Sequence, residues 1–461
     1  MISAKITKLL NLFNIIAFVV LVNLLLPHLA EANPADLFGT GSKSAAMADT
    51  GVASADQADA LFLNPARLAF TPKLSIMGGL VFQQAALQTP AGNRSIKDSW
   101  YSHFGISFPS PFKGFLQDKI QFGFFAVAPL AEMTRIEMRL PSDPAYPYFE
   151  NRSQRLVLIP GFSYILFDSP TAGKLSFGFG VNYFAALEGA IIGREGATRS
   201  VEARVFEEIQ GKATVNGGIA YNYKSLHFGF SYRQAFGLDF HNVSFNHIAG
   251  TDINLDLKGT ALYSPHTLSW GVVWKQPRYS IQFNLIEYLW SFYSTPLVSM
   301  RSQLPLVGSL VGQLPETKFN NTMAFLLGGS YKLNSKFILR GGVGFENKML
   351  PEQTGKTNLL DTHKFKLTMG LTWKLSTRLF LHGHLRYIHL FGSTHHKNIM
   401  TTDADCGTSI PASSSTVLSD EVHCVPDDES TWGFQTTNPG YPSISSGGGV
   451  FAAGITLEVR Q

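Results

Sequence analysis

The sequence predicts an all-β fold, a transmembrane antiparallel β-barrel of about 14 strands with an N-terminal hatch, or plug, inside its lumen. Charged residues make up only 15% of the 461 residues, whereas about 25% is usual in a soluble domain. After residue 32, no run of about 18 apolar residues could form a spanning helix. Instead, apolar and polar residues alternate along much of the chain after Leu74, which is typical of membrane β-strands.

The N-terminus has the features of a secretory signal peptide. Two lysines precede a mostly apolar run, Leu9 to Leu26, and Ala30-Glu31-Ala32 matches a cleavage site of the A-x-A type. An uncleaved anchor helix is the alternative, but charged and small residues follow the apolar run at once. The chain therefore divides into a signal peptide (1–32), a hatch (33–73) and a barrel with long extracellular loops (74–461).

Charge and cysteine content exclude some functions. The formal net charge of +4 gives no basis for binding nucleic acid. The chain has two cysteines, Cys406 and Cys424. After export they would meet an oxidising compartment, where they could form a disulfide. A lone pair without spaced histidines does not favour a zinc site, so we expect no metal.

The segment from Gly39 to Phe70 is the predicted hatch. It is rich in alanine and glycine and contains Asn64-Pro65-Ala66. Small side chains let backbones approach closely, and proline restricts both itself and the preceding residue. The segment should therefore form a tight, irregular structure enclosed by the strands that follow. Asn64 could cap a turn or hydrogen-bond to the backbone of the barrel.

Period-2 alternation defines the strands. In 364–374, for example, the odd positions are large and apolar and the even positions are polar or glycine. The same criterion gives fourteen strands, at 74–86, 100–110, 119–130, 153–167, 174–187, 213–223, 226–238, 266–277, 279–292, 322–333, 336–347, 363–375, 378–390 and 449–459. An even number returns both ends of the barrel to one side.

The connections between these strands mostly alternate between short and long. Short periplasmic turns and longer outer loops are expected for an outer-membrane barrel. Both termini should then be periplasmic, and the loop with the two cysteines should face outward. The third strand, 119–130, contains Gly123 and ends near Pro129. Because proline has no backbone N–H to donate to a hydrogen bond of the sheet, we expect a bulge or kink in this strand.

The N-terminal segment resembles that of the FadL/TodX family of outer-membrane hydrocarbon transporters. The shared features are a Gly-x-Gly start at Gly39, an Ala/Gly/Ser-rich middle and Asn64-Pro65-Ala66. Further similarities lie in order along the barrel, at 229–233, 288–291 and 339–342. Two features depart from the family, because Arg67 stands where glycine is usual and the chain ends in Gln461 instead of an aromatic residue.

The resemblance implies a hydrophobic ligand that is captured from outside, held in an apolar pocket and released sideways near a kinked third strand. The expected function is passive uptake of long-chain fatty acids or hydrocarbons by a multi-pass barrel in the outer membrane of a Gram-negative bacterium. The barrel would contact membrane lipid and act as a monomer. It would need no cofactor and would not be an enzyme, since no Gly-x-Ser-x-Gly elbow is present. One alternative is a similar barrel that carries or anchors surface proteins without transport, and another is a polar-solute porin, which would need an open channel.

A carboxylate ligand would need a cation in the lumen, and arginine can bind a carboxylate with two hydrogen bonds. Alternation directs three arginines inward, which makes them candidate ligand-binding residues: Arg233, Arg340 and Arg386. Pairing with luminal acids or water is the alternative for each. Lys366, His382 and His384 share this direction, but ordinary luminal polarity explains them.

Residues of the hatch complete the candidate site. Leu37 and Phe38 could line the ligand pocket, or could simply pack against the wall. Asn64, Pro65 and Ala66 are candidates for holding or gating the hatch.

Overall fold

The structure is a computed structural model and describes residues 37, 39–71, 74–89, 92–94, 99–112, 114–130, 144–150, 156–195, 201–248, 251–297, 299–304, 308–311, 317–352, 357–396, 399–400, 423–424 and 443–461. Within these residues, no helix has both the length and the apolar character needed to cross a membrane. The predicted signal peptide, Phe38 and Cys406 lie outside the described residues, so the predicted disulfide stays a prediction.

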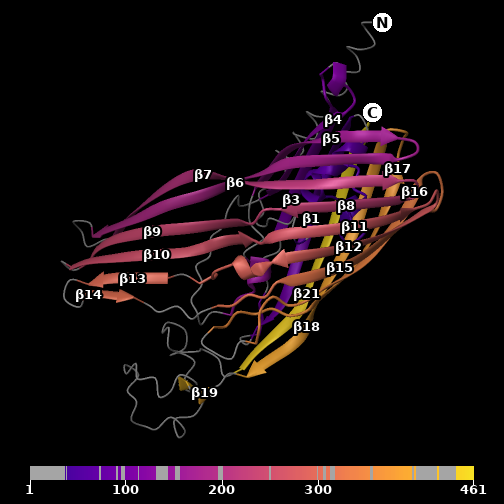
Figure 1. The fold of residues 1–461 in the computed structure, drawn as a ribbon. Helices are drawn as coiled ribbons and strands as arrows, with labels where there is room; N and C mark the ends of the chain where they lie inside the picture. Colours follow the sequence, from indigo (N-terminus) through magenta and orange to yellow (C-terminus); the bar gives the residue numbers. More distant parts are fainter. Residues whose placement is uncertain are drawn as a thin grey trace.

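Fourteen antiparallel strands form a closed barrel (Figure 1). Each strand pairs with the next, and the barrel closes where the first and last strands pair, with Ser75 opposite Arg460. The strands are β1 (Ser75–Thr89), β3 (Ser99–Pro109), β4 (Ile120–Pro129), β5 (Val157–Ser169), β6 (Gly173–Glu195), β7 (Val201–Tyr223), β8 (Leu226–Arg233), β11 (His266–Lys275), β12 (Tyr279–Leu289), β15 (Thr322–Lys332), β16 (Phe337–Glu346), β17 (Lys364–Lys374), β18 (Leu379–His396) and β21 (Ser443–Arg460). All fourteen predicted strands are confirmed.

Alternation places apolar side chains outside and polar or small side chains inside, as predicted. In β17, Met369 is 54% exposed and Trp373 is 44% exposed on the outer face, whereas Thr368 and Thr372 are buried on the inner face. A lipid-facing surface has to be apolar because hydrocarbon cannot solvate polar groups. The sequence pattern therefore fixes which side chains reach the lumen.

Both ends of the barrel lie at the end that carries the short connections. Leu379, which follows the connection 375–378, is opposite Val459 near the end of β21, and β1 begins beside the same end of β21. The other short connections, 170–172, 224–225, 276–278 and 333–336, follow the same alternation. The predicted arrangement of connections is thus confirmed.

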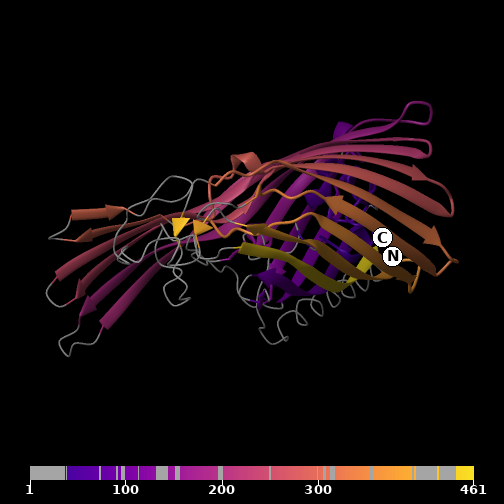
Figure 2. The ribbon, with the colours of Figure 1, turned by 90° about the horizontal axis from the view of Figure 1, so that it is seen from below.

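Three of the long connections are not irregular loops but β-hairpins. β6 and β7 stay paired as far as Glu195 opposite Val201. β9 (Phe236–Ile248) pairs with β10 (Thr251–Ser264), and β13 (Ser299–Leu304) pairs with β14 (Gly308–Val311). β6 also pairs with β9, and β10 with β13, so the hairpins form one sheet. Figures 1 and 2 show this sheet extending to the left, beyond the barrel.

Short elements complete the described chain. They are β2 (Gly92–Arg94), η2 (Gly114–Leu116), α5 (Pro147–Glu150), η3 (Trp290–Phe292), β19 (Ile399–Met400) and β20 (His423–Cys424).

The prediction of a bulge in 119–130 is wrong. β4 pairs with β3 and β5 without a register shift, because Pro129 lies at the strand end, where a missing donor is tolerated. A shift occurs instead in the pairing of β5 with β6, between Ile165 and Phe167. Pro160 lies within β5, and the β5–β6 partners step from Leu158 to Gly161 around it.

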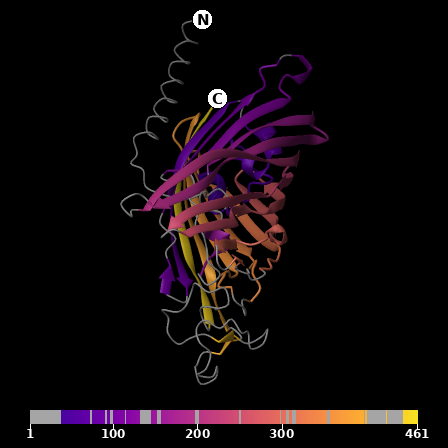
Figure 3. The same ribbon diagram turned by 90° about the vertical axis from the view of Figure 1, so that its left-hand side faces the viewer.

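Residues 39–71, called here the N-terminal segment, lie inside the barrel between its walls (Figure 3). The segment contains α3 (Ser42–Ala45), α4 (Ala60–Leu63) and η1 (Pro65–Phe70). Most of its side chains are buried. Eight glycines on the inner face of the barrel allow it to approach, since an added Cβ would come closer than 3.0 Å to an atom of the segment: Gly105, Gly161, Gly178, Gly218, Gly229, Gly328, Gly342 and Gly370.

Two neighbouring glycines of β16, Gly341 and Gly342, differ in the space that an added Cβ would have. At Gly342, a Cβ would lie 2.6 Å from the carbonyl carbon of Met47 and 2.8 Å from the amide nitrogen of Ala48. Gly341, which points outward, would meet only Thr368 O, at 3.7 Å. The glycine requirement therefore comes from the segment inside the barrel and not from the strand itself.

We predict that Gly342→Ala destabilises the folded barrel by about 1–3 kcal/mol, because overpacked interiors must shift backbone or side chains. Gly341→Ala is the matched control and should change stability much less. Heat-induced unfolding, followed by the gel mobility of the folded and unfolded forms, measures both. Equal effects of the two substitutions would contradict the close packing of the segment against β16.

Candidate functional site

Arg386 of β18 attaches the first half of the N-terminal segment. Its Nη1 donates to the Leu37 carbonyl at 2.9 Å, and its Nη2 donates to the Ala45 carbonyl at 3.3 Å. Nη2 also lies 2.7 Å from Asp49 Oδ1. The Arg386 side chain is fully buried. One guanidinium thus binds Leu37, just before the segment, and two parts of the segment itself, Ala45 and Asp49.

Asp49 also forms an ion pair with a second cation, Lys366. Its Oδ2 lies 3.2 Å from the Lys366 Nζ of β17. Burial raises the pKa of the Asp49 carboxyl, but the charges of Arg386 and Lys366 outweigh that effect and hold the pKa below its usual value. Asp49 and Ala48 have φ angles of 67° and 56°, a region that side chains other than glycine rarely adopt. The ion pairs help to hold the chain in this turn.

The second half of the segment is attached in part by neutral hydrogen bonds. Asn64 accepts from the Ala66 amide, capping η1, and its Nδ2 donates to the carbonyls of Val52 and Ile219 at 2.8 and 3.1 Å. Both structural roles considered for Asn64 are therefore present. Ser176 Oγ donates to the Ala66 carbonyl at 2.9 Å. These bonds reach β6 and β7.

Arg67, the residue that departs from the family pattern, serves the same half. It donates to the Ala55 carbonyl at 3.1 Å and to Asn222 Oδ1 at 2.9 Å, and its guanidinium lies 4.1 Å from the centre of the Phe70 ring. It is 3% exposed. The larger side chain therefore adds a link between the segment and β7.

A partly buried charged cluster lies toward the short-turn end. Lys43 pairs with Asp56, and Arg460 pairs with Glu458 at 2.6 Å. His382 Nε2 lies 3.0 Å from Glu458 Oε2. His384 is also buried inside the barrel. Arg340 donates to Thr372, so it belongs to this part of the lumen.

A luminal cavity of about 70 Å³ lies where the N-terminal segment meets the inner wall of the barrel. The segment and the strands both contribute to its walls. Its apolar lining includes Leu37, Val52, Phe62, Ile286, Leu326 and Ile388. Its charged lining consists of Asp49, Arg233, Glu346, Lys364 and Lys366.

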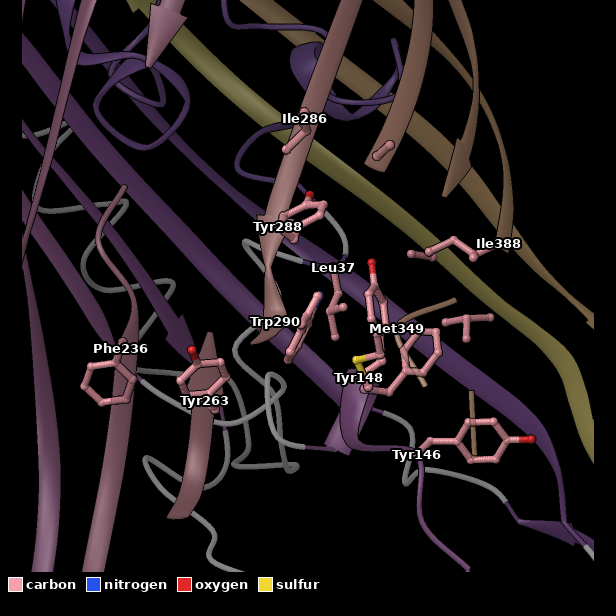
Figure 4. Packing of buried hydrophobic residues seen from close by; sticks show 14 of the residues in the cluster. Leu37, Tyr146, Tyr148, Phe236, Tyr263, Ile286, Tyr288, Trp290, Met349 and Ile388 are labelled. Carbon is pink, nitrogen blue, oxygen red and sulfur yellow. The ribbon is translucent and has the colours of Figure 1, made fainter. Parts of the chain in front are cut away.

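Aromatic side chains cover the side of this cavity away from the segment. Figure 4 shows Leu37 near Trp290 and Tyr148, with Tyr288 and Ile286 along β12. Trp290 and Tyr148 have ring centres 6.1 Å apart, and both are buried. Tyr148 and Tyr288 belong to the lining of the cavity, and Tyr148 joins Trp290 in an aromatic layer beside it.

The charged side chains around the cavity differ in the partners that they contact. Lys364 pairs with Asp361 at 2.9 Å and lies over the Tyr148 ring. Glu346 accepts from the Tyr148 hydroxyl at 2.7 Å. The Arg233 guanidinium lies 4.0 Å from the centre of the Phe62 ring. The lining of the cavity therefore combines apolar side chains with charged side chains of both signs.

The predicted site residues fall into three groups. Arg233 and Leu37 line the cavity. Arg386 lies behind it, bound to the segment, and Arg340 lies elsewhere in the lumen. Phe38 lies outside the described residues, and Asn64, Pro65 and Ala66 form the cap and start of η1.

The sequence analysis did not identify Asp49, Glu346 and Lys364 as residues of the site. It interpreted Lys366 as one of the ordinary polar residues of the lumen. Alternation places the even positions of β16 and β17 inside, which could have identified Glu346 and Lys364 as luminal. No sequence pattern indicates that Asp49 meets Lys366, because 317 positions separate the two residues.

A family described as outer membrane protein transport protein (OMPP1/FadL/TodX) matches residues 172–418. A comparison with curated proteins found no match.

Solved structures share the fold. A Pseudomonas aeruginosa FadL homologue is 11% identical, with 94% of this chain and 99% of that chain covered and a TM-score of 0.56. The toluene transporter TodX of P. putida is 13% identical, with 92% and 99% covered and a TM-score of 0.55. The toluene transporter TbuX of Ralstonia pickettii is 15% identical, with 92% and 99% covered and a TM-score of 0.52.

The burial of Asp59 predicts that the attachment of the N-terminal segment depends on pH. Burial raises the pKa of its carboxyl from 3.8 to about 6. Its Oδ2 accepts from Ser44 Oγ at 2.7 Å, while Oδ1 has no hydrogen-bond partner among the described residues. A raised pKa means that the folded state holds the proton more tightly. The contribution of Asp59 to stability is therefore most favourable below about pH 4 and is lost as the pH rises through about 6.

We predict that Asp59→Asn stabilises the segment at pH 7, on the order of 2–3 kcal/mol, and changes little at pH 4. Amide hydrogen exchange of residues 57–63, corrected for intrinsic rates, measures this. Exchange at pH 7 should be slower in the variant than in the wild type. Faster exchange at pH 7 would show that the ionised carboxylate stabilises the segment.

Proposed function

The chain belongs to the OMPP1/FadL/TodX family of outer-membrane transport proteins, and we propose that it takes up long-chain fatty acids or related hydrocarbons passively through the luminal cavity. The observation that carries this proposal is the cavity itself, which lies between the N-terminal segment and a layer of aromatic side chains. The proposed path runs from the outer aromatic layer into the cavity and then past the segment, which acts as the hatch.

The size of the cavity requires movement before a ligand can bind. Its volume is about 70 Å³, whereas a cavity of about 150 Å³ holds benzene. A long chain needs several times more space, since ligand pockets are typically about 300–1,000 Å³. On this proposal, the small cavity belongs to a closed state of the transporter. Leu37 lines the cavity and is part of the chain that would have to move.

The lining favours an amphiphilic ligand. TodX and TbuX are described as toluene transporters, and an aromatic hydrocarbon needs only apolar contacts. In this chain, Arg233, Lys364 and Lys366 line the cavity together with aliphatic side chains. A carboxylate can accept charge-assisted hydrogen bonds from such cations, which toluene cannot do, so a fatty acid matches the lining better than toluene does.

The exit step is proposed to be movement of the hatch. The resemblance to the family implies a sideways exit near the third strand, but β4 pairs continuously with both neighbours over its described residues. Release by the hatch needs no energy source or cofactor. The family consists of transport proteins and not enzymes, so we propose no reaction on the ligand.

A second candidate function is carriage of a surface protein. The sheet formed by β6, β7, β9, β10, β13 and β14 extends beyond the barrel and could present a surface to a partner. Such a barrel would not need a ligand pocket. A protein partner that co-purifies with an empty barrel would favour this function.

We predict that Ala324→Trp abolishes or strongly weakens binding of a long-chain fatty acid, because Ala324 lines the cavity on β15 and a large side chain would fill it. Phe325→Trp is the matched control, since Phe325 is 46% exposed on the outer face of the same strand. Native mass spectrometry after incubation with oleate measures occupancy. Equal occupancy in both variants would contradict binding in this cavity.

A further inference from the structure

We propose that Asp49 is an internal counter-ion that occupies the place of the ligand's acidic headgroup, so that carboxylate-headed chains release the first half of the N-terminal segment and neutral hydrocarbons do not. This inference rests on the proposed function and names the feature of the ligand that the site detects.

The first observation is the position of Asp49. Both Asp49 and Lys366 line the luminal cavity. The Asp49 carboxylate bridges two cations, with Oδ1 at 2.7 Å from Arg386 and Oδ2 at 3.2 Å from Lys366. The side chains of Asp49 and Lys366 are 14% and 19% exposed, whereas Arg386 is fully buried. A ligand in the cavity can therefore reach Lys366 directly and can compete with Asp49 for it.

The second observation concerns the other acid beside Lys366. Glu346 also lines the cavity, but its carboxylate accepts from neutral donors, Tyr148 at 2.7 Å and Thr322 at 3.5 Å. If Asp49 leaves, Lys366 and Arg386 lose their bridging carboxylate, and an uncompensated buried charge is strongly unfavourable. A ligand carboxylate can replace Asp49 with equivalent charge-assisted bonds. An alcohol or a hydrocarbon cannot.

The third observation links Asp49 to the rest of the segment. Arg386 binds Asp49 together with the carbonyls of Leu37 and Ala45. Ala48 and Asp49 have positive φ angles, which are unfavourable for residues other than glycine. Loss of the Asp49 ion pairs would let this turn relax and would loosen Leu37, which lines the cavity. Displacement of Asp49 would therefore enlarge the cavity and loosen the first half of the segment in one step.

Asp56 offers a matched control. It is also a carboxylate of the N-terminal segment, and it is paired with a cation, Lys43. It is not among the residues that line the cavity. Removing the charge of Asp56 should weaken the attachment of the segment without changing the preference of the cavity for one ligand over another.

The test compares oleate with oleyl alcohol on the full-length protein in lipid nanodiscs. Asp49→Asn should tighten oleate binding roughly tenfold, the effect of removing one competing charged hydrogen-bond acceptor. Binding of oleyl alcohol should change little. Oleate should speed amide exchange of residues 44–50 in the wild type, and the variant should exchange fast without ligand. Asp56→Asn should leave the ratio of the two affinities unchanged.

The outcomes separate this inference from the proposed function. If both ligands bind the wild type and Asp49→Asn shifts neither affinity, the inference is wrong while uptake of hydrophobic molecules stands. If neither ligand binds, both fail. Lys366→Gln keeps the test informative should Asp49→Asn not assemble, because it should remove the preference for oleate over oleyl alcohol. A retained preference in that variant would overturn the inference.

Discussion

Close approach between the N-terminal segment and the inner wall of the barrel is the constraint on which the rest of the structure depends. Eight inward-facing glycines meet the segment where a Cβ would collide with it, and the segment itself is rich in alanine and glycine. Shape complementarity of this kind tolerates little added volume. It fixes the segment relative to the strands, which brings Asp49 to Lys366 and Asn64 to Ile219.

The two halves of the segment are attached in physically different ways. The first half is held by buried charges around Arg386 and Asp49. The second half is held by neutral hydrogen bonds from Asn64 and Ser176, and by Arg67 and Lys174, whose cationic groups donate to uncharged acceptors. A neutral hydrogen bond contributes about 1 kcal/mol and offers a ligand no charge to exchange. A buried ion pair adds little net stability, yet removal of one partner is costly. The first half is therefore the part that a charged ligand can switch, while the second half keeps the segment attached.

The sequence predicted the wall of the barrel better than its contents. Alternation identified β17 and its neighbours because lipid outside and polar groups inside impose opposite requirements on successive residues. The hairpin extension of β6 and β7 was missed, because beyond the membrane no apolar face is required and the alternation disappears. Alternation also placed Arg386 in the lumen, but not its contacts. The fold of a segment more than 300 positions away determines which cation contacts Asp49 and which contacts the ligand. Alternation along one strand carries no information on the fold of that segment.

Single-channel recording in a planar bilayer tests the central claim, that residues 39–71 close the lumen. The intact protein should show no steady conductance, and a variant that lacks residues 39–71 but keeps the signal peptide and all fourteen strands should form a stable open pore. Far-ultraviolet circular dichroism and heat-dependent gel mobility would confirm that the shortened barrel is folded. A steady, large conductance in the intact protein, unchanged by the deletion, would contradict the account, because the segment would then not be the barrier in the lumen.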